Sequence, residues 1–538
     1  MKKIIIVLAG LLTGSMALNA QTLYDVNRFV GSDLNGTARF VGMGGAMGAL
    51  GGDVSTASSN PAGIALFRSN DIMMTTVGLN NMNVKSEFGT TSNEKNKTFF
   101  SFDNVGVVIT NKNNDNSSLR FLNFAVNYHR SKSFNRNMLM TGNYRASQTE
   151  QIANMVPTNI TTSDLSSDNA YLNYNIPWLG ILSYNARLIN PAYSTDGKNT
   201  FLGYDPYYSF TNSDQHSVDG TYLSKEKGGI NNFDFNIAFN FSDRFYLGAT
   251  IGAYDIDYDS RTTYTETFWA NNTDQKNDGW YSLNNKYNVD GNGVDFKLGF
   301  ILRPIDESPF RMGFAFHTPT YYYITEHQIA YLDFDAYDVD KKQFVTGTSN
   351  PYDENGNEME SETKYRIVTP WKFNFNLGYT IGSDVALGAE YEYMDYSTSK
   401  MEDDNGDKMV DETNFVNDLM KSVSTVRLGA EFKVTPDMSF RLGYNYISPS
   451  MKDNAYKQLA NNAVRTDTEY LNTKSINNLT FGIGCKYNSF YWDMAYVYSQ
   501  RKADFYPFNI YNSSNVIMPK TKVTDTNNRF LLTLGFRF

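Results

Sequence analysis

The sequence contains little cysteine and little histidine. Its 538 residues include one cysteine, Cys485, and four histidines: His129, His216, His317 and His327. A single cysteine cannot form a disulfide within the chain, so no disulfide framework stabilises the fold. The histidines are scattered, and no two of them have the spacing of a metal site. We therefore expect neither a metal nor a cofactor.

An excess of positive charge is also absent. Lysine and arginine total 47, against 57 aspartate and glutamate residues, which gives a formal net charge of -10. A nucleic-acid-binding protein needs a basic surface to contact phosphates, so we expect no nucleic-acid partner. The phosphate-binding pattern GxxxxGK is missing. No nucleophile and base are placed so as to predict an enzyme.

Long apolar runs are confined to the start of the chain. A basic Met1-Lys2-Lys3 precedes an apolar stretch over residues 4–12, and the small residue Ala20 precedes polar sequence. This pattern predicts a secretory signal peptide over residues 1–20, cleaved between Ala20 and Gln21. Gln21 rather than a cysteine stands directly after the cleavage site, so no lipid anchor is expected there. After it, no run approaches the roughly 18 apolar residues of a spanning helix.

Aromatic residues in alternating segments are what the sequence has in abundance. Aromatics make up 15% of the chain, with 38 tyrosines and 37 phenylalanines. The final segment, NNRFLLTLGFRF, alternates apolar and polar residues and places Phe530, Leu532, Leu534, Phe536 and Phe538 on one face. The alternation recurs in LTFGIGCKY, FYWDMAYVY and VRLGAEFKV, with tight turns between many such segments. An apolar medium must cover this face up to the last residue.

About fourteen such strands are expected, and short connections alternate with long ones. Hydrocarbon offers backbone groups no hydrogen bonds, so a sheet can span a membrane only when it closes on itself. The sequence therefore predicts an all-β fold, a closed antiparallel transmembrane β-barrel in the outer membrane of a Gram-negative bacterium. A large soluble β-protein, such as a propeller, is the alternative. The expected strands are 71–88, 98–110, 119–131, 230–241, 245–259, 293–303, 309–318, 370–381, 384–397, 423–434, 438–448, 476–487, 490–500 and 527–538.

The barrel is expected over residues 71–538, with a long external loop at about 132–229. Charged residues of the strands fall in the polar phase, which would face the lumen. Among them, Arg427 and Arg441 could bind the carboxylate head group of a ligand. Pairing with neighbouring carboxylates such as Glu431 is the alternative role.

Residues 21–70 lack strand patterns. Their centre, ARFVGMGGAMGALGGDVSTASSNPAGIALF, is rich in glycine and can pack into a confined space. Pro61 disfavours helix at Asn60 and predicts a turn there. The order Ala-Arg, Gly-Met-Gly-Gly-Ala, Asp and Asn-Pro-Ala-Gly, directly before the first strand of a barrel ending in phenylalanine, resembles the FadL family of outer-membrane transporters, which includes the TodX-type hydrocarbon channels.

The resemblance implies a fourteen-stranded barrel with residues 21–70 as a hatch in the lumen. It assigns the gating motif to Asn60, Pro61, Ala62 and Gly63, and it implies passive uptake of long-chain fatty acids or other hydrophobic small molecules. Expected partners are such a ligand, outer-membrane lipid and the barrel-assembly machinery, which would bind the C-terminal Phe538. The family passes its substrate sideways through an opening at a kinked early strand. The third expected strand, RFLNFAVNYHR, has neither glycine nor proline to mark such a kink.

The long loop contains the apolar segment NIPWLGILSYNARLI. Trp178, Leu179, Ile181 and Leu182 could form a groove for an apolar ligand, or pack within the loop itself. Two other functions stay open. A haem receptor could use the loop histidines His216 and His327, and a structural or non-selective barrel would use residues 21–70 as a fixed plug.

Overall fold

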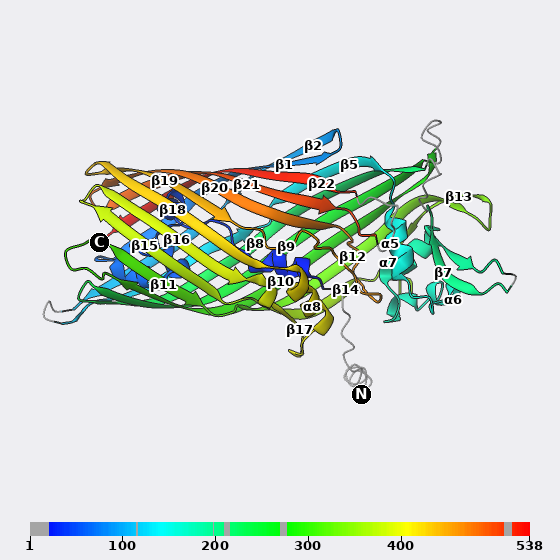
Figure 1. Ribbon diagram of the computed structural model, residues 1–538, viewed down its shortest axis with the longest axis horizontal. Helices are drawn as coiled ribbons and strands as arrows, with labels where there is room; N and C mark the ends of the chain where they lie inside the picture. The colour runs from blue at the N-terminus through cyan, green and yellow to red at the C-terminus, as the bar shows by residue number, and fades with distance from the viewer. Residues whose placement is uncertain are drawn as a thin grey trace.

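The computed structural model describes residues 21–113, 117–196, 198–208, 216–269, 277–353, 355–510 and 519–538. It forms a closed antiparallel barrel of fourteen strands (Figure 1), as the sequence predicts. Pairing of the first strand with the last, from Asp71 with Arg537 to Glu87 with Lys522, closes the barrel. No helix in these described ranges is long and apolar enough to cross a membrane. The expected signal peptide, 1–20, lies outside the described residues.

Four of the fourteen strands are interrupted, so each carries two labels: β2 with β3, β4 with β5, β11 with β12, and β14 with β15. The wall consists of β1 (Asp71–Phe88), β2 (Thr91–Ser101), β3 (Asn104–Lys112), β4 (Leu119–Ser133), β5 (Arg136–Tyr144), β8 (Ser217–Phe241), β9 (Phe245–Trp269), β10 (Asn277–Leu302), β11 (Arg311–His317), β12 (Tyr321–Asp338), β14 (Ser361–Val368), β15 (Lys372–Ile381), β16 (Val385–Asp395), β18 (Ser422–Thr435), β19 (Met438–Ile447), β20 (Tyr470–Tyr487), β21 (Phe490–Tyr506) and β22 (Thr521–Arg537).

The external loop expected at 132–229 is shorter than the sequence suggested. Strand β5 and the first part of β8 continue the wall at its two ends, so the connection runs from residue 145 to residue 216. The segment 145–208, called the cap below, contains α5 (Gln148–Met155), α6 (Thr162–Leu165), η2 (Ala170–Leu172), α7 (Trp178–Asn185), β6 (Ile189–Tyr193) and β7 (Phe201–Pro206). It covers the outer end of the barrel (Figure 1).

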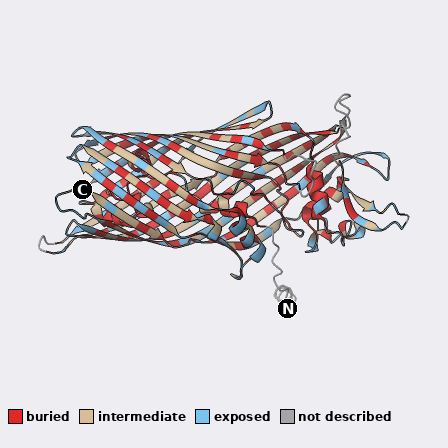
Figure 2. Cartoon of the chain, in the orientation of Figure 1, coloured by how far each residue is buried: buried red, intermediate tan, exposed pale blue. Residues whose placement is uncertain are grey.

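The wall has two zones of opposite polarity, and the long strands pass through both. On β8 the outward residues from Phe233 to Phe241 are all apolar. This stretch matches the 9 to 11 residues that a tilted strand needs to cross hydrocarbon. Further out, outward positions are polar, as at Asp257 of β9, while inward positions become apolar, as at Ile230 and Ile256. Figure 2 shows buried and exposed residues alternating along these strands.

The polarity reversal explains the strand lengths. Within the membrane the inward face is polar and is filled by the hatch segment from Thr37 to Leu66, whereas beyond the membrane the barrel has an apolar interior like that of a soluble protein. In the outer zone the apolar residues of a strand face inward, and glycines interrupt the alternation. The sequence pattern alone therefore does not distinguish strands from loops there.

Residues 21–70 form the expected lumen hatch. It contains α2 (Leu23–Val30), α3 (Ala38–Gly42), α4 (Thr56–Ser59) and the 3-10 helix η1 (Pro61–Leu66). The remaining small elements lie in external connections: β13 (Gln343–Ser349), η3 (Tyr396–Thr398), β17 (Lys400–Asp403) and α8 (Val410–Leu419).

Inward-facing glycines of the wall provide the space that the hatch occupies. A methyl group at Gly388 would overlap the carbonyl oxygen of Ala46, and one at Gly429 would overlap that of Met43. These positions are cross-strand neighbours, so they form a continuous depression. Four more wall glycines also face the hatch, and we call all six the glycine belt: Gly248, Gly299, Gly313, Gly388, Gly429 and Gly443.

The glycine belt gives the first prediction. Gly388→Ala should push the hatch away from the wall, because the new methyl group meets backbone rather than a flexible side chain, and should cost about 1–3 kcal/mol in hatch seating. We expect a severalfold rise in single-channel conductance across a planar bilayer. Ala389→Val, which changes the lipid-facing neighbour, is the control, and heat-modifiable electrophoretic mobility checks the barrel. Equal conductance of the two variants would contradict the belt's role.

Candidate functional site

The Asn60-Pro61-Ala62-Gly63 motif is the turn that seats the hatch on β8 to β11. The Asn60 side-chain oxygen accepts from the Ala62 amide at 3.2 Å, and its Nδ2 donates to the Phe300 carbonyl at 3.3 Å. Asn236 Nδ2 donates to the Pro61 carbonyl at 3.3 Å. The motif therefore fixes a chain reversal and its contact with the wall together, in agreement with the turn expected at Asn60.

A chain of alternating charges fixes the other side of the hatch. The Arg39 guanidinium donates two bonds of 3.0 Å to Glu431 of β18. Arg441 of β19 donates to the same carboxylate at 2.6 Å and to Asp493 of β21 at 2.6 Å. Paired charges of this kind satisfy each other in a water-poor lumen.

The two arginines expected to face the lumen do so, and both bind carboxylates of the wall. Arg427 donates to Glu390 at 2.5 Å and to Glu392 at 3.1 Å, and Arg441 is held by Glu431 and Asp493. Binding of a ligand head group by Arg427 or Arg441 stays a prediction, and it would require one of these ion pairs to open.

A cavity of about 280 Å³ lies between the hatch helix α2 and the wall. Its lining combines aromatic rings with charged groups and includes Arg28 of α2, Phe99 of β2, Phe134 and Lys132 near the end of β4, and Tyr258 of β9. The cavity thus extends from the centre of the barrel to the wall between β2 and β4.

The wall is open at this place. Among the described residues, β2 is hydrogen-bonded as a strand only to β1, whereas β3 continues to pair with β4 as far as Asn104 and His129. Beyond that point β5 follows β8, and side chains replace strand pairing, as where Asn93 Nδ2 donates to Thr141 Oγ1 at 2.9 Å. We call this break in the strand pairing the lateral gap.

The third expected strand carries no signal for the lateral gap, because the glycines that mark it lie on β8. The third strand breaks at Phe134 and Asn135, without glycine or proline. Opposite it, Gly228 of β8 has a φ of 104°, a conformation that favours glycine, and its carbonyl accepts from the Phe134 amide at 3.1 Å. The pair Gly228-Gly229 is therefore the sequence feature that marks the break in the third strand.

The apolar segment of the long loop forms the interior of the cap. Leu179, Ile181 and Leu182 have no exposed surface, and the Trp178 indole donates to the Tyr171 carbonyl at 3.1 Å. None of the four lines the cavity described above. As a group they pack within the loop and also against wall strands and the connection between β19 and β20. A groove formed by them would require the cap to open.

The two histidines considered for haem lie far apart. His327 on β12 is the cross-strand partner of Asn288, which is the partner of Asp259. Asp259 in turn pairs with Lys227, so His327 lies at the level of Lys227 on β8. His216 precedes β8 by one residue, so about 35 Å of extended strand separates the two levels. His216 instead stacks on Tyr208, with ring centroids 4.6 Å apart. Within the described residues no cluster of side chains is suited to a metal ion.

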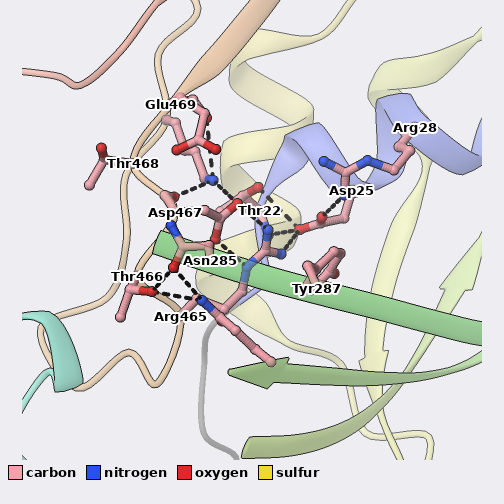
Figure 3. Close-up of polar contacts among 12 residues, drawn as sticks. Thr22, Asp25, Arg28, Asn285, Tyr287, Arg465, Thr466, Asp467, Thr468 and Glu469 are labelled. Carbon is pink, nitrogen blue, oxygen red and sulfur yellow. Dashed lines mark hydrogen bonds and ion pairs between the residues drawn. The ribbon is translucent and has the colours of Figure 1, made fainter. Parts of the chain in front are cut away.

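A buried ion network joins α2 to the connection between β19 and β20 (Figure 3). The Arg465 side chain is 1% exposed and donates to Asp25 of α2 at 2.8 Å. It also donates to both carboxylate oxygens of Asp467, at 2.8 and 2.6 Å. Lys457 donates to Asp467 at 2.6 Å, and Arg28 donates to Asp25 at 2.8 Å.

A second buried carboxylate, Glu266, holds the cap on the barrel. It accepts from Ser147 Oγ at 2.6 Å, from the Gln148 amide at 2.8 Å and from the Tyr264 hydroxyl at 2.7 Å. It lies about 43 Å of extended strand beyond Ala253, where the apolar outward stretch of β9 ends, and so outside the membrane zone. Burial raises the pKa of Glu266 to about 7, against the hydrogen bonds, which lower it.

Comparison with known proteins identifies the fold. No family model and no curated protein matches the sequence. A FadL homologue of Pseudomonas aeruginosa shares the fold with a TM-score of 0.51 and 13% identity, covering 94% of this chain and 99% of its own. The toluene transporter TodX of Pseudomonas putida has a TM-score of 0.47 and 11% identity, covering 95% of this chain and 100% of its own. The toluene transporter TbuX of Ralstonia pickettii has a TM-score of 0.42 and 11% identity, covering 94% of this chain and 99% of its own. The resemblance expected from residues 38–67 is thus confirmed at the level of the fold.

The Glu266 site predicts that the cap loosens as pH rises. Because the pKa is raised in the folded cap from 4.5 to about 7, its contribution to stability is complete below about pH 4.5 and is lost towards pH 7, on the order of 3 kcal/mol in all. Hydrogen-exchange protection of α5, corrected for intrinsic rates, should fall between pH 5 and pH 8. Glu266→Gln should remove that dependence, and a wild-type profile in this variant would refute the assignment.

Proposed function

We propose that the protein is an outer-membrane channel for passive uptake of hydrophobic small molecules, including long-chain fatty acids. The lateral gap carries this proposal, because it joins an internal cavity lined by aromatic rings to the outer edge of the lipid-facing zone. An apolar solute can then leave the barrel without crossing an aqueous compartment, which keeps its apolar surface out of water.

The gap lies at the level where hydrocarbon gives way to head groups. Directly below it, the Tyr128 ring packs on Phe102 and Phe233, with centroids 5.5 and 5.2 Å apart. The Phe100 side chain next to the gap is 77% exposed, the most exposed large apolar group of the described chain. Aromatic side chains at this level are typical of a membrane interface.

The periplasmic end offers an apolar solute no comparable route. Two cavities there, of about 200 and 330 Å³, meet at the Arg39–Glu431 ion pair and are also lined by Lys433. An apolar molecule would have to desolvate these charges without replacing their bonds. The hatch keeps this end closed, and we propose that gating requires part of it to move. The exposed Phe538, which stacks on Phe536, is the proposed recognition residue for the barrel-assembly machinery.

Uptake in a deletion strain tests the function. Labelled oleate and toluene should accumulate when the wild-type gene is restored and should not accumulate without it. In a Cys485→Ser background, the pair Asn93→Cys with Thr141→Cys should cross-link β2 to β5 and reduce uptake at least tenfold, because the gap can no longer widen. Reduction of the disulfide should restore uptake.

The control cross-link joins β1 to β2, at Asn83→Cys with Asn96→Cys, where the strands are already paired. It should leave uptake unchanged. Full uptake through the oxidised Asn93–Thr141 pair would exclude the lateral route. Equal uptake with and without the protein would favour the structural barrel.

A further inference from the structure

Helix α2 fills an apolar chamber in the outer zone of the barrel. Leu23, Val26 and Phe29 on one face of the helix are at most 2% exposed. They pack against inward residues of the wall, Ile230, Ile256, Val289, Ile324 and Ile367. This chamber exists because the polarity of the wall reverses beyond the membrane, and a piece of the chain itself now occupies it.

The polar end of α2 completes the fit. Asp25 extends from the same helix and places its carboxylate on Arg465 (Figure 3). The chamber therefore holds an apolar body that ends in a carboxylate on a buried guanidinium. A single-chain carboxylic acid has the same two parts in the same order, and a guanidinium binds either carboxylate equally well by geometry.

The helix is joined to the hatch by a short exposed link. Ser32 and Asp33 are exposed, whereas the body from Thr37 to Leu66 is held by the glycine belt, Arg39 and Asn60. Hence α2 can leave its place while the hatch body stays. Tyr24, Asn27 and Arg28 on its other face line the 280 Å³ cavity, so its departure would merge that cavity with the chamber.

The chamber wall next to α2 can adapt to a different occupant. Five buried methionines belong to the apolar cluster around the helix, on the wall and around α8: Met394, Met401, Met409, Met420 and Met451. Methionine side chains are unbranched and fill irregular space, so the same wall can enclose a helix or an extended chain.

We propose that α2 is a built-in competitor of the ligand, and that an aliphatic carboxylic acid binds by replacing α2, with its carboxylate on Arg465 in place of Asp25. This inference rests on the proposed function. It names the group that recognises the ligand and the part of the hatch that moves. The apparent association constant is then the intrinsic one multiplied by the fraction of time that α2 is out of the chamber.

The first test weakens the competitor. Asp25→Asn removes the carboxylate from α2 and leaves its apolar face, so oleate should bind the purified protein at least fivefold more tightly. Methyl oleate, which lacks the carboxylate, should bind more weakly than oleate to every form that keeps Arg465. Asp306→Asn, which breaks only an exposed ion pair with Arg244, is the matched control and should bind like wild type.

The second test follows α2 directly. Addition of oleate should speed hydrogen exchange of amides 23–30 and leave amides 38–66 unchanged. Arg465→Lys, with heat-modifiable mobility as a check of folding, should lose most of the preference for oleate over methyl oleate.

The outcomes separate the two proposals. Slower exchange of α2 with oleate, or wild-type affinity in Asp25→Asn, would overturn the competitor role even if uptake is normal. If the wild-type protein neither bound nor took up oleate or toluene, the proposed function itself would be overturned.

Discussion

The whole architecture depends on the absence of hydrogen-bonding partners for the backbone in hydrocarbon. Each strand must pair on both sides, so the sheet closes through β1 and β22. Closure creates a lumen, and the lumen must be filled. The glycine belt and the hatch are one solution to that requirement, because each glycine gives up a side chain where the hatch lies against the wall. The lateral gap is a break in this pairing, and it lies beside the cavity.

The reversal of polarity along the strands links this constraint to function. Within the membrane the wall is apolar outside and polar inside, and further out the order is exchanged. An apolar ligand therefore finds apolar surroundings in two places: in the barrel interior of the outer zone, and in the lipid around the membrane zone. The lateral gap lies where the two zones meet, so it connects the two apolar environments by a short path. Helix α2 occupies the first of them and contacts the cavity between them.

The sequence predicted the features that follow from strict local patterns. Period-two alternation predicted about fourteen strands and the inward phase of Arg427 and Arg441, and the family resemblance of the glycine-rich segment implied the hatch. It failed where the decisive contact was distant in sequence. Gly228 breaks the strand beside it, the partners of Asp25 lie near residue 465, and the cap buries Leu179 against residues of other strands. Outer-zone strands were missed because their apolar face points inward and glycines interrupt them.

Nitroxide accessibility tests most directly that a bilayer covers the inner zone. In a Cys485→Ser background, a spin label at Phe235, outward on β8 within the apolar stretch, is compared in liposomes with one at Leu223, outward on the same strand but twelve residues nearer the outer end. The account predicts high oxygen and low nickel-chelate accessibility at Phe235, and the opposite at Leu223. High nickel-chelate accessibility at both positions would contradict it.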